Sequence, residues 1–158
     1  MIINFTKEEC ELILEFTKQS EGLTSNPIYR NSNYLAWYIF RNDETEWIFN
    51  RVFNYVRTIA KINKEFNMLF LQSVTEGNAF EKHVDLSEYF NVGVCLNDDY
   101  VGGELYVENS NYLIEKKQGN IYFFEGHKPH GINKVIKGQR FALVGFFEKG
   151  YLEFNKLV

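Results

Sequence analysis

The apolar positions near the start of the chain recur with the period of a helix. Thr6 and Glu9 have the spacing of a capping box, in which the hydroxyl accepts a backbone N–H and the carboxylate reaches back to the cap. Apolar residues then follow at helical spacing until residues 21–27, a Glu-Gly-Leu-Thr-Ser-Asn-Pro run, break the pattern. The pattern predicts a first helix that begins at the cap and ends near residue 20.

A second helical stripe follows a short polar segment. Asp43 and Glu46 repeat the cap spacing, which predicts that this helix begins near residue 43. The apolar stripe is about four turns long and consists of Ile48, Val52, Phe53, Val56, Ile59 and Ala60. We expect this helix to pack its apolar face on a sheet.

From about residue 67 the pattern changes to short runs typical of strands, bounded by Gly, Asn and Asp turns. The runs are Met68–Val74, Asn91–Leu96, Gly103–Val107, Asn120–Phe124 and Arg140–Phe147. Strands without intervening helices cannot form βαβ units, so the sheet should be mainly antiparallel. The predicted fold is therefore mainly β with N-terminal helices (α+β), a double-stranded β-helix (a cupin-like jelly roll) braced by two helices.

The length of 158 residues favours one domain, and the sequence has no internal repeat, linker or shift in composition. We expect a single domain over residues 1–158, with residues 1–66 as helical support and residues 67–158 as the jelly-roll core. Aromatic residues make up 17% of the chain, which excludes a disordered protein because such chains lack large apolar groups to bury.

The charge pattern excludes two classes of partner. The net charge is −4 and no run of basic residues is long enough to neutralise many phosphates, so we expect no nucleic acid partner. No segment without a charge exceeds that of residues 31–40, which is far shorter than the roughly 20 residues that a membrane helix needs. The acidic N-terminus does not resemble a signal peptide, and the separated Cys10 and Cys95 suit a reduced compartment. We therefore predict a cytoplasmic protein, and its many asparagines and few alanines indicate a low-GC source, a phage or an AT-rich bacterium.

Two histidines and an aspartate are candidates for metal ligands. His83 and Asp85 are two residues apart, so on an extended segment their side chains lie on one face. His130 follows a predicted strand and its short turn. Two imidazoles and one carboxylate form the facial triad that binds non-haem Fe(II) and leaves positions open for other ligands. The alternative for an isolated His-x-Asp pair is a solvated turn without a metal.

Arg140 opens an apolar strand whose neighbours should bury it, and a buried arginine needs an anion. Because a guanidinium fits a carboxylate with two parallel hydrogen bonds, the anion could be an Asp or Glu of the chain itself. The other candidate is a dicarboxylate cosubstrate that binds Arg140 at one end and the metal at the other. Phe146 is six residues after Arg140, so the two side chains lie on the same face of this strand. Phe146 is therefore either part of the wall of that pocket or part of the core.

These residues lie in motifs that resemble the Fe(II)- and 2-oxoglutarate-dependent dioxygenases of the prolyl 4-hydroxylase type. The motifs, which span most of the chain in the order of that family, are His83-Val84-Asp85, residues 96–105 (Leu-Asn-Asp-Asp-Tyr-Val-Gly-Gly-Glu-Leu), residues 118–124 (Gln-Gly-Asn-Ile-Tyr-Phe-Phe), Pro129-His130-Gly131-Ile132 and residues 138–143 (Gly-Gln-Arg-Phe-Ala-Leu). The resemblance implies that His83, Asp85 and His130 hold the iron. It also implies that Arg140 binds the far carboxylate of 2-oxoglutarate. His127 lacks the ten-residue spacing to Arg140, so we expect it in a surface loop.

The chain departs from this family at two positions where relatives carry a tyrosine. Relatives often carry a tyrosine that hydrogen-bonds the cosubstrate about nine residues before the first ligand, where this sequence has Val74. A second tyrosine of some relatives is replaced by Cys95. Tyr89, Tyr106 and Tyr122 are the candidates for the hydroxyl that takes over, and the sequence alone does not choose among them.

The resemblance implies hydroxylation of an unactivated C–H bond, coupled to decarboxylation of 2-oxoglutarate to succinate, with L-ascorbate as a further cofactor. The implied substrate is a prolyl or other residue in a protein or peptide, with residues 29–42 as a lid over it. A free amino acid or small metabolite is the alternative within the same chemistry, and nucleobase demethylation is disfavoured by the acidic charge. A metal-binding, cupin-like barrel without catalysis is the alternative outside it, and a zinc hydrolase would not need Arg140.

Overall fold

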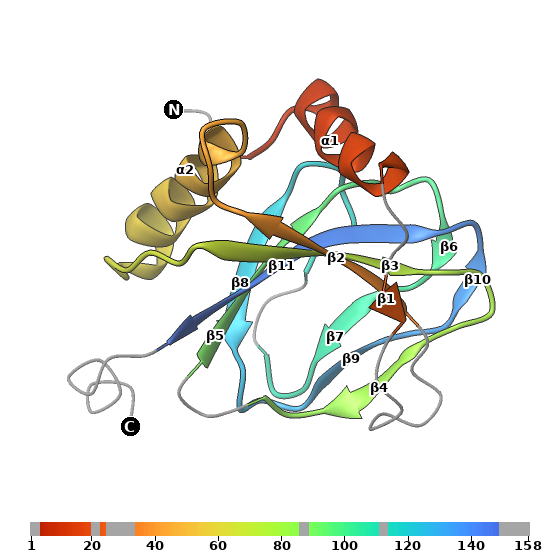
Figure 1. The fold of residues 1–158 in the computed structure, drawn as a ribbon. Coiled ribbons are helices and arrows are strands. Elements are labelled where there is room, and N and C mark those ends of the chain that lie inside the picture. Colours follow the sequence, from red (N-terminus) through yellow and green to blue (C-terminus); the bar gives the residue numbers. More distant parts are fainter. Residues whose placement is uncertain (1–3, 20–22, 25–33, 86–88, 111–113, 149–158) are drawn as a thin grey trace.

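The computed structural model describes residues 4–19, 23–24, 34–85, 89–110 and 114–148 (Figure 1). The helical elements are α1 (Lys7–Leu14) with the 3₁₀ turn η1 (Glu15–Lys18), and α2 (Glu46–Tyr55) with the π-helical turn η2 (Val56–Ala60). The longer strands are β2 (Tyr34–Phe40), β3 (Met68–Val74), β4 (Phe80–His83), β5 (Tyr89–Cys95), β8 (Ile121–Glu125) and β11 (Arg140–Glu148). The shorter ones are β1 (Leu23–Thr24), β6 (Val101–Gly102), β7 (Leu105–Val107), β9 (His130–Ile132) and β10 (Val135–Lys137).

The described strands form a large sheet and two small ones. The large sheet has the order β1-β2-β3-β11-β5-β8, the second has the order β4-β9-β7, and β10 pairs with β6. Every pairing is antiparallel, as the sequence predicts. Figure 1 shows both helices on one side of the large sheet and the sheet of β4, β9 and β7 on the other side. The predicted mainly β, jelly-roll fold braced by two helices is therefore confirmed.

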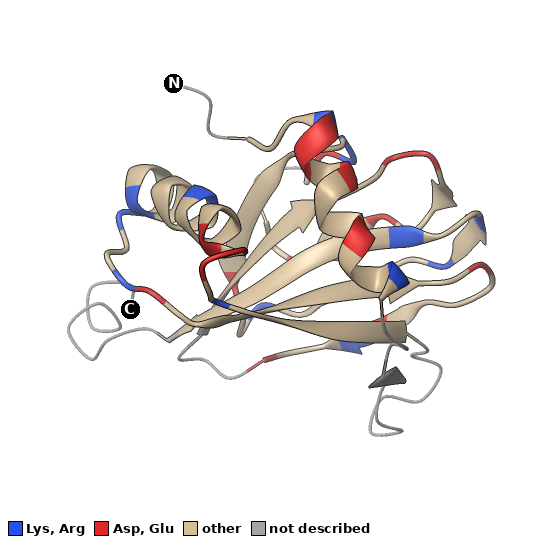
Figure 2. Cartoon of the chain, turned by 45° about the horizontal axis from the view of Figure 1, so that its top comes forward, with Lys and Arg blue, Asp and Glu red and all other residues tan. Residues whose placement is uncertain are grey.

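The two faces of the large sheet have different roles because side chains alternate along each strand. One face packs on the helices and forms the main core, to which α2 contributes Ile48, Phe49, Val52 and Phe53, with Leu69 and Leu71 of β3 and Leu143 of β11 opposite them. Charged residues lie mainly on the helices and loops, and most of the large sheet carries none (Figure 2). The opposite face is available for a site. No helix in the described part of the chain is long and apolar enough to cross a membrane.

The predicted cap and start of the first helix are confirmed, whereas the α-helix ends at Leu14, before the predicted end near residue 20. Thr6 caps α1, because its hydroxyl accepts the N–H of Glu9 at 3.1 Å and its own N–H donates to the Glu9 carboxylate at 2.8 Å. Among the predicted strands, the bounds of β3 agree with the sequence pattern, and the other predicted runs overlap β5, β7, β8 and β11. At these positions the capping residues and the alternation of apolar and polar residues were sufficient to predict the structure.

The predicted start of the second helix was wrong by three residues. The helix begins at Glu46 after Thr45, and the predicted capping pair of Asp43 and Glu46 does not form. The side chain of Asn42 instead accepts the N–H groups of Glu44 and Thr45, which makes a separate turn before the helix. The carboxylate of Glu46 binds Arg41 through two contacts of 2.7 Å, so it does not reach back to the cap.

The segment before the second helix was expected to be a lid within a helical support region, and the helical expectation was wrong for residues 34–40. They form β2, which pairs with β3 over seven residue pairs. The physical reason is the residue content, Tyr-Leu-Ala-Trp-Tyr-Ile-Phe, because aromatic and β-branched residues favour a strand. Residues 29–33 of the expected lid lie outside the described residues. The single-domain organisation with its boundary at residue 66 stays a prediction, although β2 places part of residues 1–66 in the large sheet.

Arg51 connects the two helices and provides a test of this packing. Its guanidinium binds both oxygens of Glu9 at 2.9 and 2.7 Å, donates to the carbonyl of Asn4 at 2.7 Å and lies over the ring of Phe5. We expect Arg51→Ala to lower the free energy of unfolding by about 1 to 2 kcal/mol, because several charge-assisted contacts of a partly buried group are lost. Urea denaturation measures this, with Lys7→Ala as the control because the Lys7–Glu11 pair is exposed. Equal stability of the two variants would contradict this role of Arg51.

Candidate metal centre

The second sheet brings the predicted ligands together. His83 ends β4 and His130 begins β9, and the two residues are direct partners in the antiparallel register. Their rings are 4.4 Å apart between centroids. Asp85 follows two residues after His83, and the ligand atoms of all three side chains lie within 4.8 Å of one another. The structure thus gathers three residues separated by up to 47 positions in the sequence.

Backbone carbonyls orient both imidazoles toward Asp85. The Nδ1 atom of His83 lies 2.8 Å from the carbonyl oxygen of Glu81, and that of His130 lies 2.7 Å from the carbonyl of Lys128. Since a carbonyl only accepts, Nδ1 carries the hydrogen in each ring and Nε2 is left with its lone pair. The Nε2 atoms of His83 and His130 lie 3.6 and 3.2 Å from the Asp85 carboxylate. This is the tautomer that a histidine needs to bind a metal through Nε2.

The protonation of the cluster also suits a cation. Burial lowers the pKa of His83, and the hydrogen bond to Glu81 offsets only part of this effect. Burial alone would raise the pKa of Asp85, but the contact with His130, the hydrogen bond from Asn91 and the nearby His83 imidazole hold this pKa below its usual value. A neutral imidazole and an ionised carboxylate are the forms that bind a metal.

Asn91 is a site residue that the sequence analysis missed. It lies on β5, is only 4% exposed, and its side-chain N–H donates to the Asp85 carboxylate at 2.5 Å. The same nitrogen lies 3.4 Å from Nε2 of His130, and its Oδ1 has no partner among the described residues. A polar residue at a buried position of an apolar strand was the signal available in the sequence. Asn91 fixes the Asp85 carboxylate beside the two imidazoles.

We expect Asn91→Ala to weaken metal binding by about 10- to 100-fold, because groups that orient a ligand contribute this much to affinity. Titration of the metal-free protein with Mn(II), followed by calorimetry, measures the change. Asn133→Ala is the matched control, since Asn133 is exposed just beyond β9. An unchanged affinity in Asn91→Ala would show that the Asp85 carboxylate needs no support.

A cavity of about 190 Å³ separates the cluster from Arg140. Arg140 is 4% exposed, and its Nη1 atom has no hydrogen-bond partner among the described residues. None of the ion pairs formed by the described residues includes Arg140, so the structure does not support the alternative of an internal carboxylate. A buried guanidinium with an unused donor, facing a cavity, fits the anion that the sequence analysis expected.

The other sequence predictions resolve as follows. His127 is in a surface turn as predicted, with its side chain 48% exposed and 3.3 Å from Glu125. Phe146 lines the cavity and is partly exposed, which places it at the wall rather than in the core. Val74 is fully buried in a small apolar cluster, and the thiol of Cys95 donates to the carbonyl of Asn97 at 3.1 Å.

Of the three tyrosines proposed to supply a hydroxyl, Tyr122 lines the cavity. The described side chains that form the cavity wall do not include Tyr106, whose hydroxyl lies over Gly131. The side chain of Tyr89 is outside the described part. Tyr122 is therefore the candidate that the geometry supports.

Comparisons with known proteins agree with this arrangement. No family model matches the chain. A PKHD-type hydroxylase of Idiomarina loihiensis is 33% identical over 61 residues, which cover 37% of this chain and 28% of that protein. The match thus spans less than a third of the curated relative.

Solved structures match over nearly the whole chain. An oxidoreductase of the 2OG-Fe(II) oxygenase family from Burkholderia pseudomallei has a TM-score of 0.72 at 16% identity, covering 92% of this chain and 81% of its own. The viral collagen prolyl hydroxylase of Paramecium bursaria Chlorella virus-1, solved as a 2-oxoglutarate complex, has a TM-score of 0.67 at 16% identity and covers 92% of both chains. The resemblance stated from the motifs is confirmed, and the fold is the one these oxygenases share.

Proposed function

We propose that the chain is an Fe(II)- and 2-oxoglutarate-dependent dioxygenase that hydroxylates an unactivated C–H bond. One observation carries this proposal: the His83, Asp85 and His130 cluster shares a single cavity with Arg140, whose buried Nη1 lacks a partner in the described part of the chain. The three-residue cluster suits a divalent transition metal that keeps open coordination positions, and Arg140 suits a carboxylate. A 2-oxo dicarboxylate is the kind of molecule that could satisfy both ends.

The residues present fit the metal and the cosubstrate. His83 and His130 would offer Nε2 and Asp85 one oxygen, with Asn91 holding that carboxylate in place. Arg140 would bind the distal carboxylate of 2-oxoglutarate and so set its orientation. The bound iron and 2-oxoglutarate supply the oxidising chemistry, with succinate as the coproduct. The protein positions these groups and excludes water, since Phe80, Phe124 and Ile132 line the cavity.

The substrate we propose is a residue of a protein or peptide, prolyl or other. The acidic and basic side chains among the described lining residues are the three candidate ligands and Arg140. A free amino acid would bring an ammonium and a carboxylate, for which no counter-charge is left in this wall once Asp85 binds the metal and Arg140 binds the cosubstrate. A residue within a peptide carries neither charge. The collagen prolyl hydroxylase among the structural matches supports this class of substrate.

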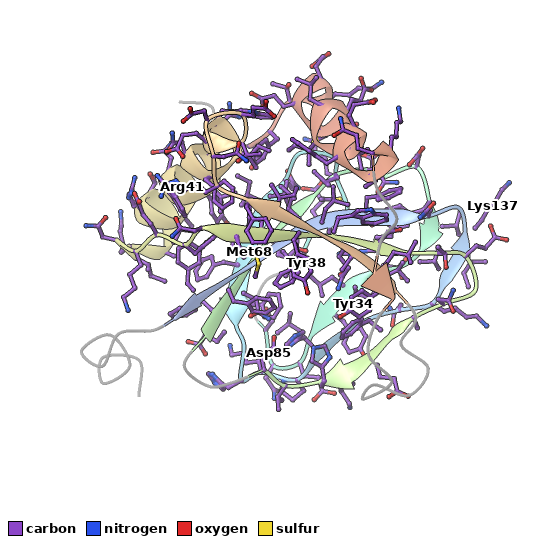
Figure 3. All side chains as sticks on the ribbon, viewed as in Figure 1. Tyr34, Tyr38, Arg41, Met68, Asp85 and Lys137 are labelled. Carbon is purple, nitrogen blue, oxygen red and sulfur yellow. The ribbon has the colours of Figure 1, made fainter. Side chains whose placement is uncertain are left out.

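An aromatic shelf next to the cavity supports the same class. The shelf consists of Tyr38, Phe40, Phe70 and Phe146, with ring centroids 5.1 to 6.2 Å apart between neighbours. Phe70 and Phe146 also line the cavity, while Phe40 is 60% exposed. Figure 3 shows Tyr34 and Tyr38 on the side of β2 away from the helices, the side on which Asp85 lies. A continuous apolar surface that leads from solvent to the cluster suits the side chains that flank a target residue.

Succinate formation tests the proposal. The purified protein with Fe(II), 2-oxoglutarate and oxygen is incubated with pools of proline-containing and proline-free peptides, and mass spectrometry locates any added oxygen atom. We expect peptide-dependent succinate and one oxygen gained per turnover. If only free amino acids or metabolites increased succinate formation, the substrate would be a small molecule and not a peptide. A need for L-ascorbate and a cytoplasmic location stay predictions.

A further inference from the structure

The ring of Tyr122 crosses a neighbouring strand to reach the anion end of the cavity. Tyr122 lies on β8 and pairs with Gly93 on β5, and Gly93 pairs on its other side with Val144 on β11, the strand that Arg140 opens. A Cβ atom built on Gly93 would lie 2.2 Å from Cζ and 2.3 Å from the hydroxyl oxygen of Tyr122. The phenol therefore lies directly over Gly93, and any larger residue at that position would displace it.

The phenol of Tyr122 lies within reach of the charge of the Arg140 guanidinium. Burial raises the pKa of Tyr122, and the charge and the side-chain hydrogen bond of Arg140 oppose this effect only in part. The phenol is thus neutral at physiological pH. Since a guanidinium only donates, it cannot take up the phenol hydrogen, which remains to be donated to an anion.

Two hydrogen-bond donors are therefore available in the same cavity wall. The Nη1 group of Arg140 has no partner among the described residues, and Tyr122 lies near enough to feel the charge of the guanidinium. Both residues line the cavity that begins at the metal cluster. One cationic and one neutral donor at the end of a narrow apolar cavity form a site for a carboxylate.

We propose that Tyr122 binds the distal carboxylate of 2-oxoglutarate together with Arg140, and that Gly93 provides the space for its ring. This inference rests on the proposed function. The hydroxyl then comes from β8, across a glycine of β5, and not from the positions of Val74 and Cys95, where the resemblance implied a tyrosine. Tyr122 and Gly93 then determine which 2-oxo acid the cavity accepts.

The experiment measures binding without turnover, by calorimetry on Mn(II)-loaded protein. We expect Tyr122→Phe to weaken 2-oxoglutarate by at least about 10-fold, the effect of losing a hydrogen bond to a charged group. Its affinity for 2-oxopentanoate, which has no distal carboxylate, should equal that of the unmodified chain. Tyr106→Phe is the matched control because the Tyr106 ring lies over Gly131 in the same manner but outside the described cavity wall. It should bind both 2-oxo acids normally.

Gly93→Ala tests the space argument separately. The new methyl group must displace the phenol, so we expect weaker 2-oxoglutarate binding with unchanged Mn(II) affinity. If this variant does not fold, the result for Tyr122→Phe alone tests the inference. Normal 2-oxoglutarate affinity in Tyr122→Phe, or an equal loss for both 2-oxo acids, would overturn the inference and leave the proposed function intact. Failure of the unmodified Mn(II) protein to bind 2-oxoglutarate would instead contradict the proposed function.

Discussion

A His83→Ala protein is expected to lose at least about three orders of magnitude of succinate formation, because the metal contribution of several kcal/mol to the reaction barrier disappears with its ligand. Nε2 of His83 lies 3.6 Å from Asp85 and within the cluster of three ligand atoms, and the ring ends the short strand β4. Removing it leaves one imidazole and one carboxylate, too few protein ligands for stable binding of Fe(II) in an open site. Calorimetry should show directly that the variant no longer binds Mn(II).

His127→Ala is the matched control for this variant. His127 is three residues from His130 but sits in an exposed turn beside Glu125, so we expect normal metal binding and normal succinate formation. A His83→Ala protein that still forms succinate at the ordinary rate would contradict the assignment of the cluster. Equal losses in the two variants would point to a general effect of histidine removal.

Arg140→Met is expected to weaken 2-oxoglutarate binding by about 100-fold or more, since removing one partner of a buried charge pair costs several kcal/mol. Mn(II) binding should be unchanged because the cluster and Arg140 lie on different sheets. The cosubstrate affinity of the Mn(II)-loaded protein measures the effect. Unchanged 2-oxoglutarate affinity would contradict the assigned role.

The stability of the same variant separates an anion-binding role from a structural one. If Arg140 were paired with an internal carboxylate, its removal would destabilise the fold by about 3 to 5 kcal/mol. Because Nη1 lacks a partner in the described part of the chain, we expect the ligand-free Arg140→Met protein to unfold at the same temperature as the unmodified chain or higher. Excess 2-oxoglutarate should then stabilise only the unmodified chain.

Local signals in the sequence were sufficient for the elements that depend on them. The capping box of Thr6 and Glu9 specifies α1, and alternation with bounding turns specifies β3. The spacing of His83 and Asp85 identified two of the clustered residues before any contact was known. These features need only neighbours within a few positions, so a single sequence contains them.

The missed features depend on pairing between distant segments. β2 has apolar residues on both faces, with Trp37 packed against the helix-side core and Ala36 lining the cavity, so it lacks the alternation that marks a half-exposed strand. The contact of Asn91 with Asp85 requires β5 to lie beside the loop after β4. Tyr122 was one of three candidates until the register placed it over Gly93.

The most direct test of the account is anaerobic addition of Fe(II) and then 2-oxoglutarate to the metal-free protein, followed by visible absorption. A 2-oxo acid chelated to ferrous iron gives a weak charge-transfer band that neither component gives alone. We predict that the band forms, that His83→Ala and Arg140→Met weaken it, and that it disappears when oxygen is admitted while succinate accumulates. Iron that is bound without a band at saturating 2-oxoglutarate would contradict the proposed function, and a metal-binding barrel without this catalysis would be the better description of the protein.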